Sequence, residues 1–471
     1  MLTPTIGIEV HVELKSKTKV FSDSINNFKD DINTNVNVID LGYPGTLPKL
    51  NKEVINQALL SALAFNCKIN QVMHFDRKNY FYPDLPKGFQ ITQKDTPIGY
   101  DGYIEIEDDG VVKQIGLERM HIEEDTCKSI HKGDKTLLNA NRAGVPLIEI
   151  VSKPVIKSAN EAMLYLEKLR ETLLYLGVSD VKIEEGSMRC DANVSLSDSD
   201  KLGTKTEIKN IGSISNVGLA INYEIERQKN IINSSGKVRE ETRRFDDKTN
   251  TTVLMRIKET GNDYRYMPEP DIPYVVISDE EIENIRKTIP KLPSQLRKEY
   301  KDLGINNNAI TTLINDKELN DYFNSIIDKT NPIVLSNLLT TDILGYLNKN
   351  FVKLENIKIT KDELINLIDK IDKKIISSKQ SKEILNYILD NGGKVEEVCD
   401  KLNIKQINDD NELINIVKQV LTNNTESLND YKNGKDRALK YLMGQIMKET
   451  KGQANPVKVN EILINELSNY W

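Results

Sequence analysis

The segment from residue 6 to residue 14 places an imidazole between two carboxylates. Apolar and polar residues alternate strictly in IGIEVHVEL, which is typical of a β-strand with one buried face. Glu9, His11 and Glu13 share the polar face, with neighbours about 6–7 Å apart along the strand. Such a row can hold a divalent metal ion, or it can be a solvated strand face. The solvated face is the favoured interpretation unless other segments supply further ligands.

Later segments do supply further acidic groups. HIEED at 121–125 holds three acids beside a histidine, and Glu149 stands alone in the apolar run PLIEIV, where a charge costs free energy unless it is paired or bound to metal. The alternating segments 186–196 and 204–210 add Asp191 and a face of Lys and Glu. If these strands share a sheet, their oxygen-rich faces suit Mg²⁺ or Mn²⁺ better than zinc. A salt-bridged open sheet face is the alternative.

Two other regions combine cations with aromatic residues. FDRKNYFYPDLPKGFQ at 75–90 places Lys78 and Lys87 among tyrosines and phenylalanines, and the arginines of ETRRFD and DYRYMPEP follow later in the chain. Arginine suits phosphate groups, and an aromatic ring suits a base or ribose. Arg–carboxylate pairing in a structural loop is the alternative for each residue alone. Metal-type carboxylates together with phosphate-type cations predict phosphoryl chemistry.

Composition limits the class of protein. The 471 residues carry a net charge of −7, which argues against non-specific coating of nucleic acid, although residues 431–458 hold seven Lys/Arg against two acids. The four cysteines form no CxxC motif, so a reducing, cytoplasmic setting is expected, and no apolar run is long enough for a membrane span. Phosphate-loop, GxGxxG and GxSxG motifs, and amidase or glutaminase signatures, are absent.

The sequence predicts an α+β protein. Before residue 278 the chain is rich in Gly, Pro and Tyr with short alternating runs, which indicates a β-rich region, and after it helical periodicity and capping signals dominate. One helix is expected earlier, between Ser158 and Gly177. We predict a β-rich domain at 1–293, an all-α helical domain at 294–405 and a small all-α tail at 406–471.

The chemistry-bearing segments resemble the GatB family, whose members form one subunit of the aspartyl/glutamyl-tRNA amidotransferases. The resemblance covers essentially the whole chain in order, and it rests on GIEVHVEL, LGYPGTLP, RKNYFYPDLPKGFQITQ, HIEED, GVPLIEIVS, VKIEEGSMRCDANVSL, EIKNIGS, ETRRFD, YRYMPEPD and KGQANPVKVNE. It implies an N-terminal cradle, a helical domain and a tRNA-binding tail.

The resemblance also implies an activity. This chain would be the kinase of a heterotrimer, together with an amidase subunit, which releases ammonia from glutamine, and with a small third subunit. It would use ATP and Mg²⁺ to phosphorylate the side-chain carboxylate of Glu-tRNA(Gln) or Asp-tRNA(Asn), which ammonia then converts to the amide. The sequence does not decide between these two misacylated tRNAs, and it gives neither the ammonia path nor the orientation of the tail.

Site residues follow from the resemblance position by position. The implied metal ligands and catalytic residues are Glu9, His11, Glu124, Glu149 and Asp191, with Glu123 and Asp125 left open as replacements for Glu124. The implied nucleotide or acceptor-end contacts are Lys78, Tyr80, Lys87 and Arg189. The implied tRNA contacts of the tail are Lys435, Arg437, Lys440 and Lys451. Glu13 matches no functional position and is expected to be a solvated group or a neighbour of the ligands.

One segment departs from the family pattern. Many members have a cysteine pair just before LGxPG, where this chain has Asn37 and Asp40, so we predict no zinc. Two other functions remain alternatives: a non-catalytic tRNA-binding scaffold, and a stand-alone metal-dependent ligase. An intact acidic cluster argues against the scaffold, and co-purification with an amidase would argue against the stand-alone ligase.

Overall fold

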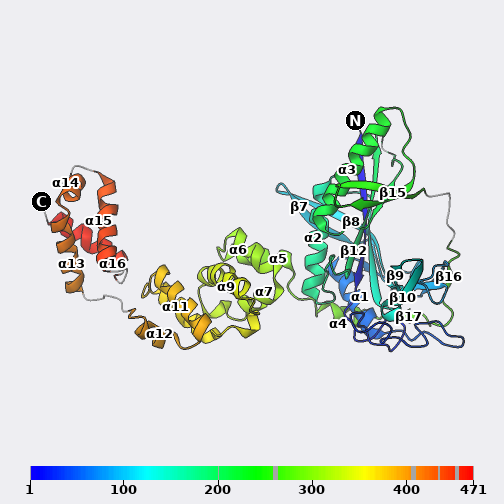
Figure 1. Ribbon diagram of the computed structural model, residues 1–471, viewed down its shortest axis with the longest axis horizontal. Coiled ribbons are helices and arrows are strands. Elements are labelled where there is room, and N and C mark those ends of the chain that lie inside the picture. Colours follow the sequence, from blue (N-terminus) through cyan, green and yellow to red (C-terminus); the bar gives the residue numbers. More distant parts are fainter. Residues whose placement is uncertain are drawn as a thin grey trace. The chain divides into compact units, whose positions relative to one another are not determined.

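The computed structural model describes residues 2–199, 201–257, 264–404, 410–432, 435–450, 454 and 456–469. The chain divides into two compact units, Met1–Pro293 and Ser294–Trp471, and each is described by itself. The first unit combines a large sheet with helices, and the second is helical (Figure 1). The predicted α+β fold class is confirmed.

The first unit is built on one sheet of ten strands. Its order is β15-β14-β13-β12-β1-β11-β8-β6-β2, with β7 paired to β8, and only β13 and β14 run parallel among the described strands. The strands are β1 (Thr3–Glu13), β2 (Lys68–Ile69), β6 (Gly99–Tyr100), β7 (Tyr103–Asp108), β8 (Val111–Glu124), β11 (Pro146–Ser152), β12 (Met188–Ser197), β13 (Thr206–Lys209), β14 (Glu241–Asp246) and β15 (Thr251–Ile257).

Smaller strand pairings surround this sheet. They join β16 to β4 and β4 to β5, β9 to β10, and β3 to β17. The strands are β3 (Val72–Met73), β4 (Asp76–Asn79), β5 (Phe89–Thr92), β9 (Lys128–Lys132), β10 (Lys135–Asn139), β16 (Met267–Pro268) and β17 (Val275–Val276). A short 3₁₀ turn, Ala140–Arg142, follows β10 and leads into β11.

Helices cover the apolar face of the sheet. Ile6, Ile8, Val10 and Val12 of β1 are fully buried and belong to one core with α1 (Lys52–Ala64), α2 (Ala159–Leu176) and α3 (Ile214–Asn233). Helices α2 and α3 pack on each other beside the strands, as Figure 1 shows. The opposite, polar face of β1 is therefore not covered by these helices.

The ends of α2 agree with the helix expected between Ser158 and Gly177. Ser158 accepts a hydrogen bond from the Glu161 backbone N–H, and Gly177 ends the helix at a positive φ of 72°. The Glu161 carboxylate accepts from the Lys157 N–H and from Lys113 Nζ. The Ser158 cap thus agrees with the sequence pattern, whereas the Glu161 carboxylate binds Lys157 and Lys113 and does not complete a capping box with the Ser158 N–H.

The remaining helices follow β17. Helix α4 (Asp279–Arg286) begins with a capping box at Ser278 and Glu281. The helices of the second unit are α5 (Pro293–Asp302), α6 (Asn307–Asn315), α7 (Lys317–Asn324), α8 (Pro332–Asn337), α9 (Leu344–Asn350), α10 (Lys361–Asp372), α11 (Ser378–Asn391), α12 (Val395–Lys401), α13 (Asp410–Asn423), α14 (Thr425–Lys432), α15 (Asp436–Glu449) and α16 (Pro456–Ser468).

The last four helices share a core of their own, which includes Leu413, Val417, Leu442, Ile446 and Leu463. The predicted boundary near residue 405 stays a prediction, since residues 405–409 lie outside the described part of the chain. Within the described residues, no helix is both long and apolar enough to span a membrane.

Candidate functional site

The register of the central strands brings distant polar residues into one row. His11 on β1 lies opposite Glu149 on β11 and opposite Arg189 on β12. Glu149 in turn lies opposite His121 on β8. Since side chains two residues apart share a face of a strand, the acids of each strand line the same side of the sheet as this row. The polar faces therefore do share one surface.

His11 lies among buried acids. Its Nε2 is 3.4 Å from Glu123 Oε1 and 3.5 Å from Glu149 Oε2. His121 Nε2 is 3.2 Å from the same Glu149 oxygen. One possible ligand atom each from His11, Glu123 and Glu149 lies within 4.8 Å of the others, which is a spacing that could hold a metal ion. We call His11, His121, Glu123 and Glu149 the histidine–glutamate cluster.

Mutual charge pairing shifts the pKa values in this cluster. Burial lowers the pKa of His11, but the hydrogen bond to Glu149 and the charge of Glu123 outweigh it and raise the value to about 9. Burial raises the pKa of Glu149, yet the charges and hydrogen bonds of His121 and His11 hold it well below its ordinary range. Protons on imidazoles therefore balance the buried carboxylates in the metal-free protein.

A second acidic group lies on the neighbouring strands. Glu9 on β1 faces Asp191 on β12, and possible ligand atoms of Glu9, Asp191 and Glu207 lie within 4.8 Å of one another. Lys209 Nζ bridges two of these acids, at 2.5 Å from Asp191 Oδ2 and 2.8 Å from Glu207 Oε1. Burial and then the charge of Glu149 raise the pKa of Glu9. We call Glu9, Asp191 and Glu207 the second acidic group.

The donor set fits a hard divalent cation. Oxygen ligands with one or two imidazoles are those that Mg²⁺ and Mn²⁺ accept. Around the histidine–glutamate cluster, His121 Nδ1, Arg119 Nε and Arg189 Nε are buried without a hydrogen-bond partner among the described residues. Unpaired buried polar atoms are unfavourable unless something binds them. A cavity of about 430 Å³ adjoins both groups and is lined by His11, Ile183, Met188, Arg189, Cys190, Asp191, Lys209, Asn210, Ile211 and Gly212.

The structure places Glu123, rather than the expected Glu124, beside His11. Consecutive residues of a strand point to opposite faces, so Glu123 shares the face of His121 whereas Glu124 does not. Glu124 Oε1 instead lies 2.5 Å from Lys87 Nζ and accepts a hydrogen bond from the Ile91 N–H at 2.9 Å. Glu124 therefore contacts Lys87 in this structure, and its role as a metal ligand stays a prediction. The period of two in HIEED places Glu123 and His121 on one face of the strand.

Asp125 anchors two arginines at the end of β8. Its Oδ2 lies 2.5 Å from Arg142 Nε and 2.6 Å from Arg189 Nη2. Arg142 Nε is also 4.0 Å from Glu13 Oε1. Burial and the charge of Asp125 raise the pKa of Glu13 to about 7. Glu13 is therefore a buried group beside the arginines rather than a solvated one, and Arg142 is a site neighbour that the sequence did not single out.

Aromatic rings and lysines form a ladder beside the acids. Lys78 Nζ lies 4.9 Å from the ring centre of Tyr264 and 5.8 Å from that of Tyr80. The ring centres of Tyr80 and Tyr264 are 6.0 Å apart, and those of Tyr264 and Tyr266 are 6.1 Å apart. Burial and then the charge of Glu123 raise the pKa of Tyr80. The Tyr80 hydroxyl is therefore close enough to the histidine–glutamate cluster for an electrostatic interaction. The sequence indicated Lys78 and Tyr80 but assigned no role to Tyr264 or Tyr266.

The implied tRNA contacts of the tail lie on and just before α15. Lys435 caps this helix, and its Nζ pairs with Asp430 Oδ1 at 2.8 Å. Arg437 and Lys440 are exposed on the same helix. Lys451 lies outside the described residues. None of these residues belongs to the first unit, so they form a separate candidate site.

Known proteins match the chain over nearly its full length. Residues 4–283 match the GatB/GatE catalytic domain, and residues 321–467 match the GatB domain. The corresponding subunit of the aspartyl/glutamyl-tRNA(Asn/Gln) amidotransferase of Geobacillus thermodenitrificans is 49% identical over 98% of both chains. The chain belongs to the GatB family. The GatB proteins of Lactiplantibacillus plantarum and Staphylococcus aureus are each 48% identical, again over 98% of both chains.

The GatB/GatE catalytic match spans every residue of the sheet face described above. It therefore places both acidic groups and the aromatic ladder in the region by which the family's catalytic domain is defined. The GatB domain match spans α7 to α16 and includes the basic residues of α15. The predicted family is confirmed, whereas the roles of individual residues are matters for proposal.

Proposed function

We propose that this chain is the kinase and tRNA-binding component of a tRNA-dependent amidotransferase. It would transfer the γ-phosphoryl group of ATP to the side-chain carboxylate of Glu-tRNA(Gln), Asp-tRNA(Asn) or both, and ammonia would then displace phosphate to give the amide. The observation that carries the proposal is the meeting of buried carboxylates, imidazoles and free arginine nitrogens on one polar sheet face. Family membership supports it independently.

The two acidic groups supply the residues for Mg²⁺. Glu9, His11, Glu123, Glu149 and Asp191 would hold the ion, with Glu123 in the place first assigned to Glu124. When bound, Mg²⁺ supplies charge neutralisation between the ATP phosphates and the substrate carboxylate. The protein's own contribution is to keep Glu149 and Glu123 ionised, as their lowered pKa values indicate, whereas burial raises the pKa of Glu9.

The reaction needs no general base from the protein. A glutamate or aspartate side chain is already ionised near neutral pH and can attack phosphorus directly. The protein's task is then to bring two anions together. Arg189 and Lys209 stand at the cavity that adjoins both acidic groups, where their charges offset this repulsion. His11 serves in this scheme as a ligand and not as a proton carrier.

The aromatic ladder suits the acceptor end of tRNA or the adenine of ATP. Stacked bases are held by aromatic faces at about 1–3 kcal/mol each, and a lysine beside them attracts phosphate. Lys78 already lies against two of the rings, and Tyr80 lies close enough to feel the charge of Glu123. A terminal nucleotide on these rings would place its esterified amino acid toward the histidine–glutamate cluster.

The complex would join this chain to an amidase subunit, with a small third subunit completing the heterotrimer. The names of the relatives describe one subunit of an amidotransferase, and the sequence has no amidase or glutaminase signature of its own. Ammonia must therefore come from a partner. The exposed Arg437 and Lys440 of the tail would bind the tRNA backbone, for which cationic side chains are suited.

Variants of the complete complex test the proposal. His11→Ala should abolish phosphorylation of misacylated tRNA while glutamine hydrolysis by the partner survives at least in part. His131→Ala is the matched control, because His131 is an exposed histidine on β9 outside both acidic groups. Mg²⁺-dependent amidation at the wild-type rate by the His11 variant would refute the assignment, as would full activity of this chain without a partner.

A further inference from the structure

The side chain of Lys19 is completely buried, at 0% exposure, in the segment between β1 and α1. Its Nζ lies 3.2 Å from Asp40 Oδ2 and donates to the Ala140 carbonyl oxygen at 3.3 Å. Burial lowers the pKa of Lys19, and the charge of Asp40 opposes that shift. A buried ammonium group is stable only if its charge is paired, so Asp40 is required where it lies.

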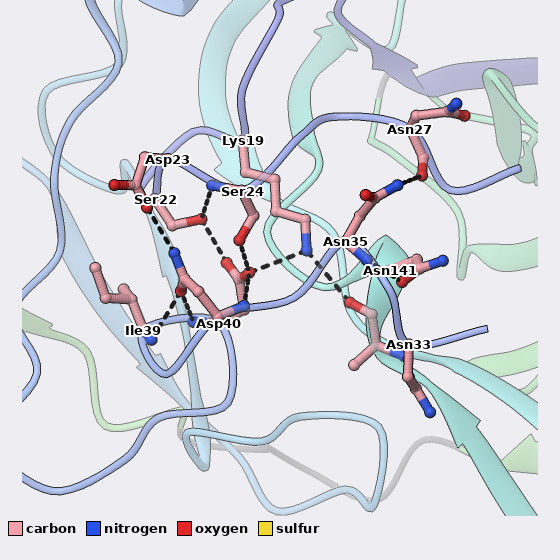
Figure 2. Close-up of polar contacts among 12 residues, drawn as sticks. Lys19, Ser22, Asp23, Ser24, Asn27, Asn33, Asn35, Ile39, Asp40 and Asn141 are labelled. Atoms are coloured by element: carbon pink, nitrogen blue, oxygen red, sulfur yellow. Dashed lines mark hydrogen bonds and ion pairs between the residues drawn. The ribbon is translucent and has the colours of Figure 1, made fainter. Parts of the chain in front are cut away.

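Asp40 is the centre of a hydrogen-bonded cluster. Ser22 Oγ donates to Oδ1 and Ser24 Oγ donates to Oδ2, each at 2.6 Å, and the Asn37 N–H donates to Oδ2 at 3.1 Å. Figure 2 shows Lys19, Ser22 and Ser24 close to the Asp40 carboxylate. We call Lys19, Ser22, Ser24, Asn37 and Asp40 the Asp40 cluster. Both carboxylate oxygens are satisfied, as a buried charge demands.

The Asp40 cluster lacks the donors of a structural zinc site. Zinc in structural sites takes four thiolate or imidazole ligands. The Asp40 cluster offers hydroxyls, an amide and one carboxylate, and it holds an ammonium group against that carboxylate. Cys127 is buried nearby, and burial raises the pKa of its thiol to about 11, but one thiol does not complete such a site. The residues present therefore do not fit zinc.

The Asp40 cluster is tied to the turn that carries Arg142. Besides the Lys19 bond to Ala140, the Val20 N–H donates to the Gly144 carbonyl oxygen at 3.0 Å. The same turn is held from Asn33, whose Oδ1 accepts from the Ala140 N–H at 2.6 Å. Arg142 extends from this turn to Asp125, which directly follows β8. Asp125 also pairs with Arg189 of β12. A continuous set of contacts thus joins Asp40 to the rim of the candidate site.

We propose that Asp40, acting through Lys19, is a positioning residue that fixes the Arg142 turn at the rim of the candidate site, and that this segment is held by a buried ion pair and not by a structural zinc. The part that concerns catalysis rests on the proposed function. Its physical basis is that a buried, fully hydrogen-bonded charge pair has one favourable arrangement and so fixes the backbone groups bonded to it.

Paired variants separate positioning from folding. Asp40→Asn leaves Lys19 buried and unpaired, so it is expected to unfold the segment. The double variant Lys19→Met with Asp40→Asn removes both charges and keeps similar volumes, so it should fold, because replacing a whole buried pair is far milder than breaking one. Lys49→Met is the matched control, since Lys49 pairs with Asp23 at 3.7 Å in the same segment but is 69% exposed.

The measurements are made on the complex with its partners. For the double variant we expect faster amide hydrogen exchange at residues 138–145, a kcat for amidation roughly tenfold lower, and little change in the KM for misacylated tRNA, because small misplacements near a reacting centre reduce rate more than binding. Metal analysis of the wild-type complex should find no stoichiometric zinc. Lys49→Met should match the wild type in every measurement.

Several results would overturn the inference. They are wild-type exchange and kcat in the double variant, stoichiometric zinc in the wild-type complex, or an unfolded double variant, which would make the pair a requirement for folding and not a positioning device. A wild-type complex that fails to amidate tRNA would instead refute the proposed function. Hydrogen exchange would still decide whether Asp40 fixes the turn.

Discussion

The ammonium group of Lys209 lies beside Asp191, where a metal ion could otherwise bind: its Nζ is 2.5 Å from Asp191 Oδ2. The same ammonium group lies 2.8 Å from Glu207 Oε1, so one internal positive charge serves two of the three carboxylates of the second acidic group. The histidine–glutamate cluster has no lysine in its described ion pairs and relies on imidazoles. The two groups therefore differ in how readily a divalent ion can enter.

Removal of Lys209 should create additional metal affinity. In Lys209→Met, the carboxylates of Glu9, Asp191 and Glu207 lose their compensating charge, so a divalent ion becomes the favoured way to neutralise them. We expect Mn²⁺ titration, followed by electron paramagnetic resonance, to show tighter Mn²⁺ binding than in the wild type. Lys205→Met, at an exposed position on the same segment, is the control. Equal Mn²⁺ affinity in all three proteins would contradict this expectation.

Substitutions at the adjacent residues Glu123 and Glu124 should have different effects, one on metal binding and the other on stability. Glu123→Gln is expected to weaken Mn²⁺ binding by about tenfold or more, because it removes a charged ligand beside His11. Glu124→Gln should leave metal affinity nearly unchanged and lower thermal stability, since it leaves Lys87 without its carboxylate partner. Calorimetric titration and thermal melting of both variants test this pair, and the reversed pattern would restore Glu124 as the ligand.

Glu13 should make stability depend on pH near neutrality. Its pKa is raised from 4.5 to about 7, so between these values the folded protein holds a proton that the unfolded chain has released. Stability therefore falls as pH rises through this window. Glu13→Gln should be more stable than the wild type at pH 8 by about 1–3 kcal/mol, and the difference should shrink toward pH 4.5.

Urea-denaturation midpoints at both pH values measure the Glu13 effect. Glu184→Gln provides a control, because Glu184 is an exposed glutamate. A difference between Glu13→Gln and the wild type that stays constant with pH would show that Glu13 titrates as an ordinary carboxylate. The charge of the buried Glu13 carboxylate beside Asp125 would then have to be balanced by other groups.

The aromatic ladder should contribute to tRNA binding through its ring faces. Tyr264→Ala is expected to raise the KM for misacylated tRNA by about tenfold, while Tyr264→Phe stays near the wild type, because stacking uses the ring and not the hydroxyl. Tyr43→Ala is the control, since Tyr43 is 55% exposed and lies outside the described ladder contacts. Equal effects of the Ala and Phe substitutions would exclude stacking as the cause.

Charge removal on α15 should weaken tRNA binding in a salt-dependent way. The double variant Arg437→Ala, Lys440→Ala removes two exposed cations, so the slope of log affinity against log salt should fall by about 2 if both contact phosphates. Filter binding at several salt concentrations measures this slope. Lys418→Ala on α13 is a control with a similarly exposed lysine. An unchanged slope would move the tRNA contact away from α15.

The sequence predicted which face of a strand is buried far better than it predicted which strands pair with each other. Alternation in IGIEVHVEL and around Asp191 correctly separated buried from polar side chains, because the period of a strand is a local property. The pairing of Glu9 with Asp191 is set by register between distant segments, which no local pattern specifies. Only the resemblance joined these residues beforehand.

The choice among Glu123, Glu124 and Asp125 stayed open for a different reason. Motif matching gave the segment, but which acid lies beside His11 depends on which face of β8 lies beside β11. The sequence placed Lys209 only on a polar strand face and did not single out Arg142. Their importance comes from the acids they contact, and those contacts cross between strands or from a turn to a strand end. Such residues carry no chemical signature of their own in the sequence.

The central place of β1 in the sheet has a consequence for biosynthesis. Strand β1 pairs with β11 and β12, which are completed only after residues 152 and 197 have been made. The apolar side chains of β1 therefore stay unpaired until these later strands have been synthesised, and pairings between distant segments form slowly. A nascent chain that stops before β11 has no template for Ile6–Leu14, so Glu9 and His11 reach their places on the sheet only after the later strands have been synthesised.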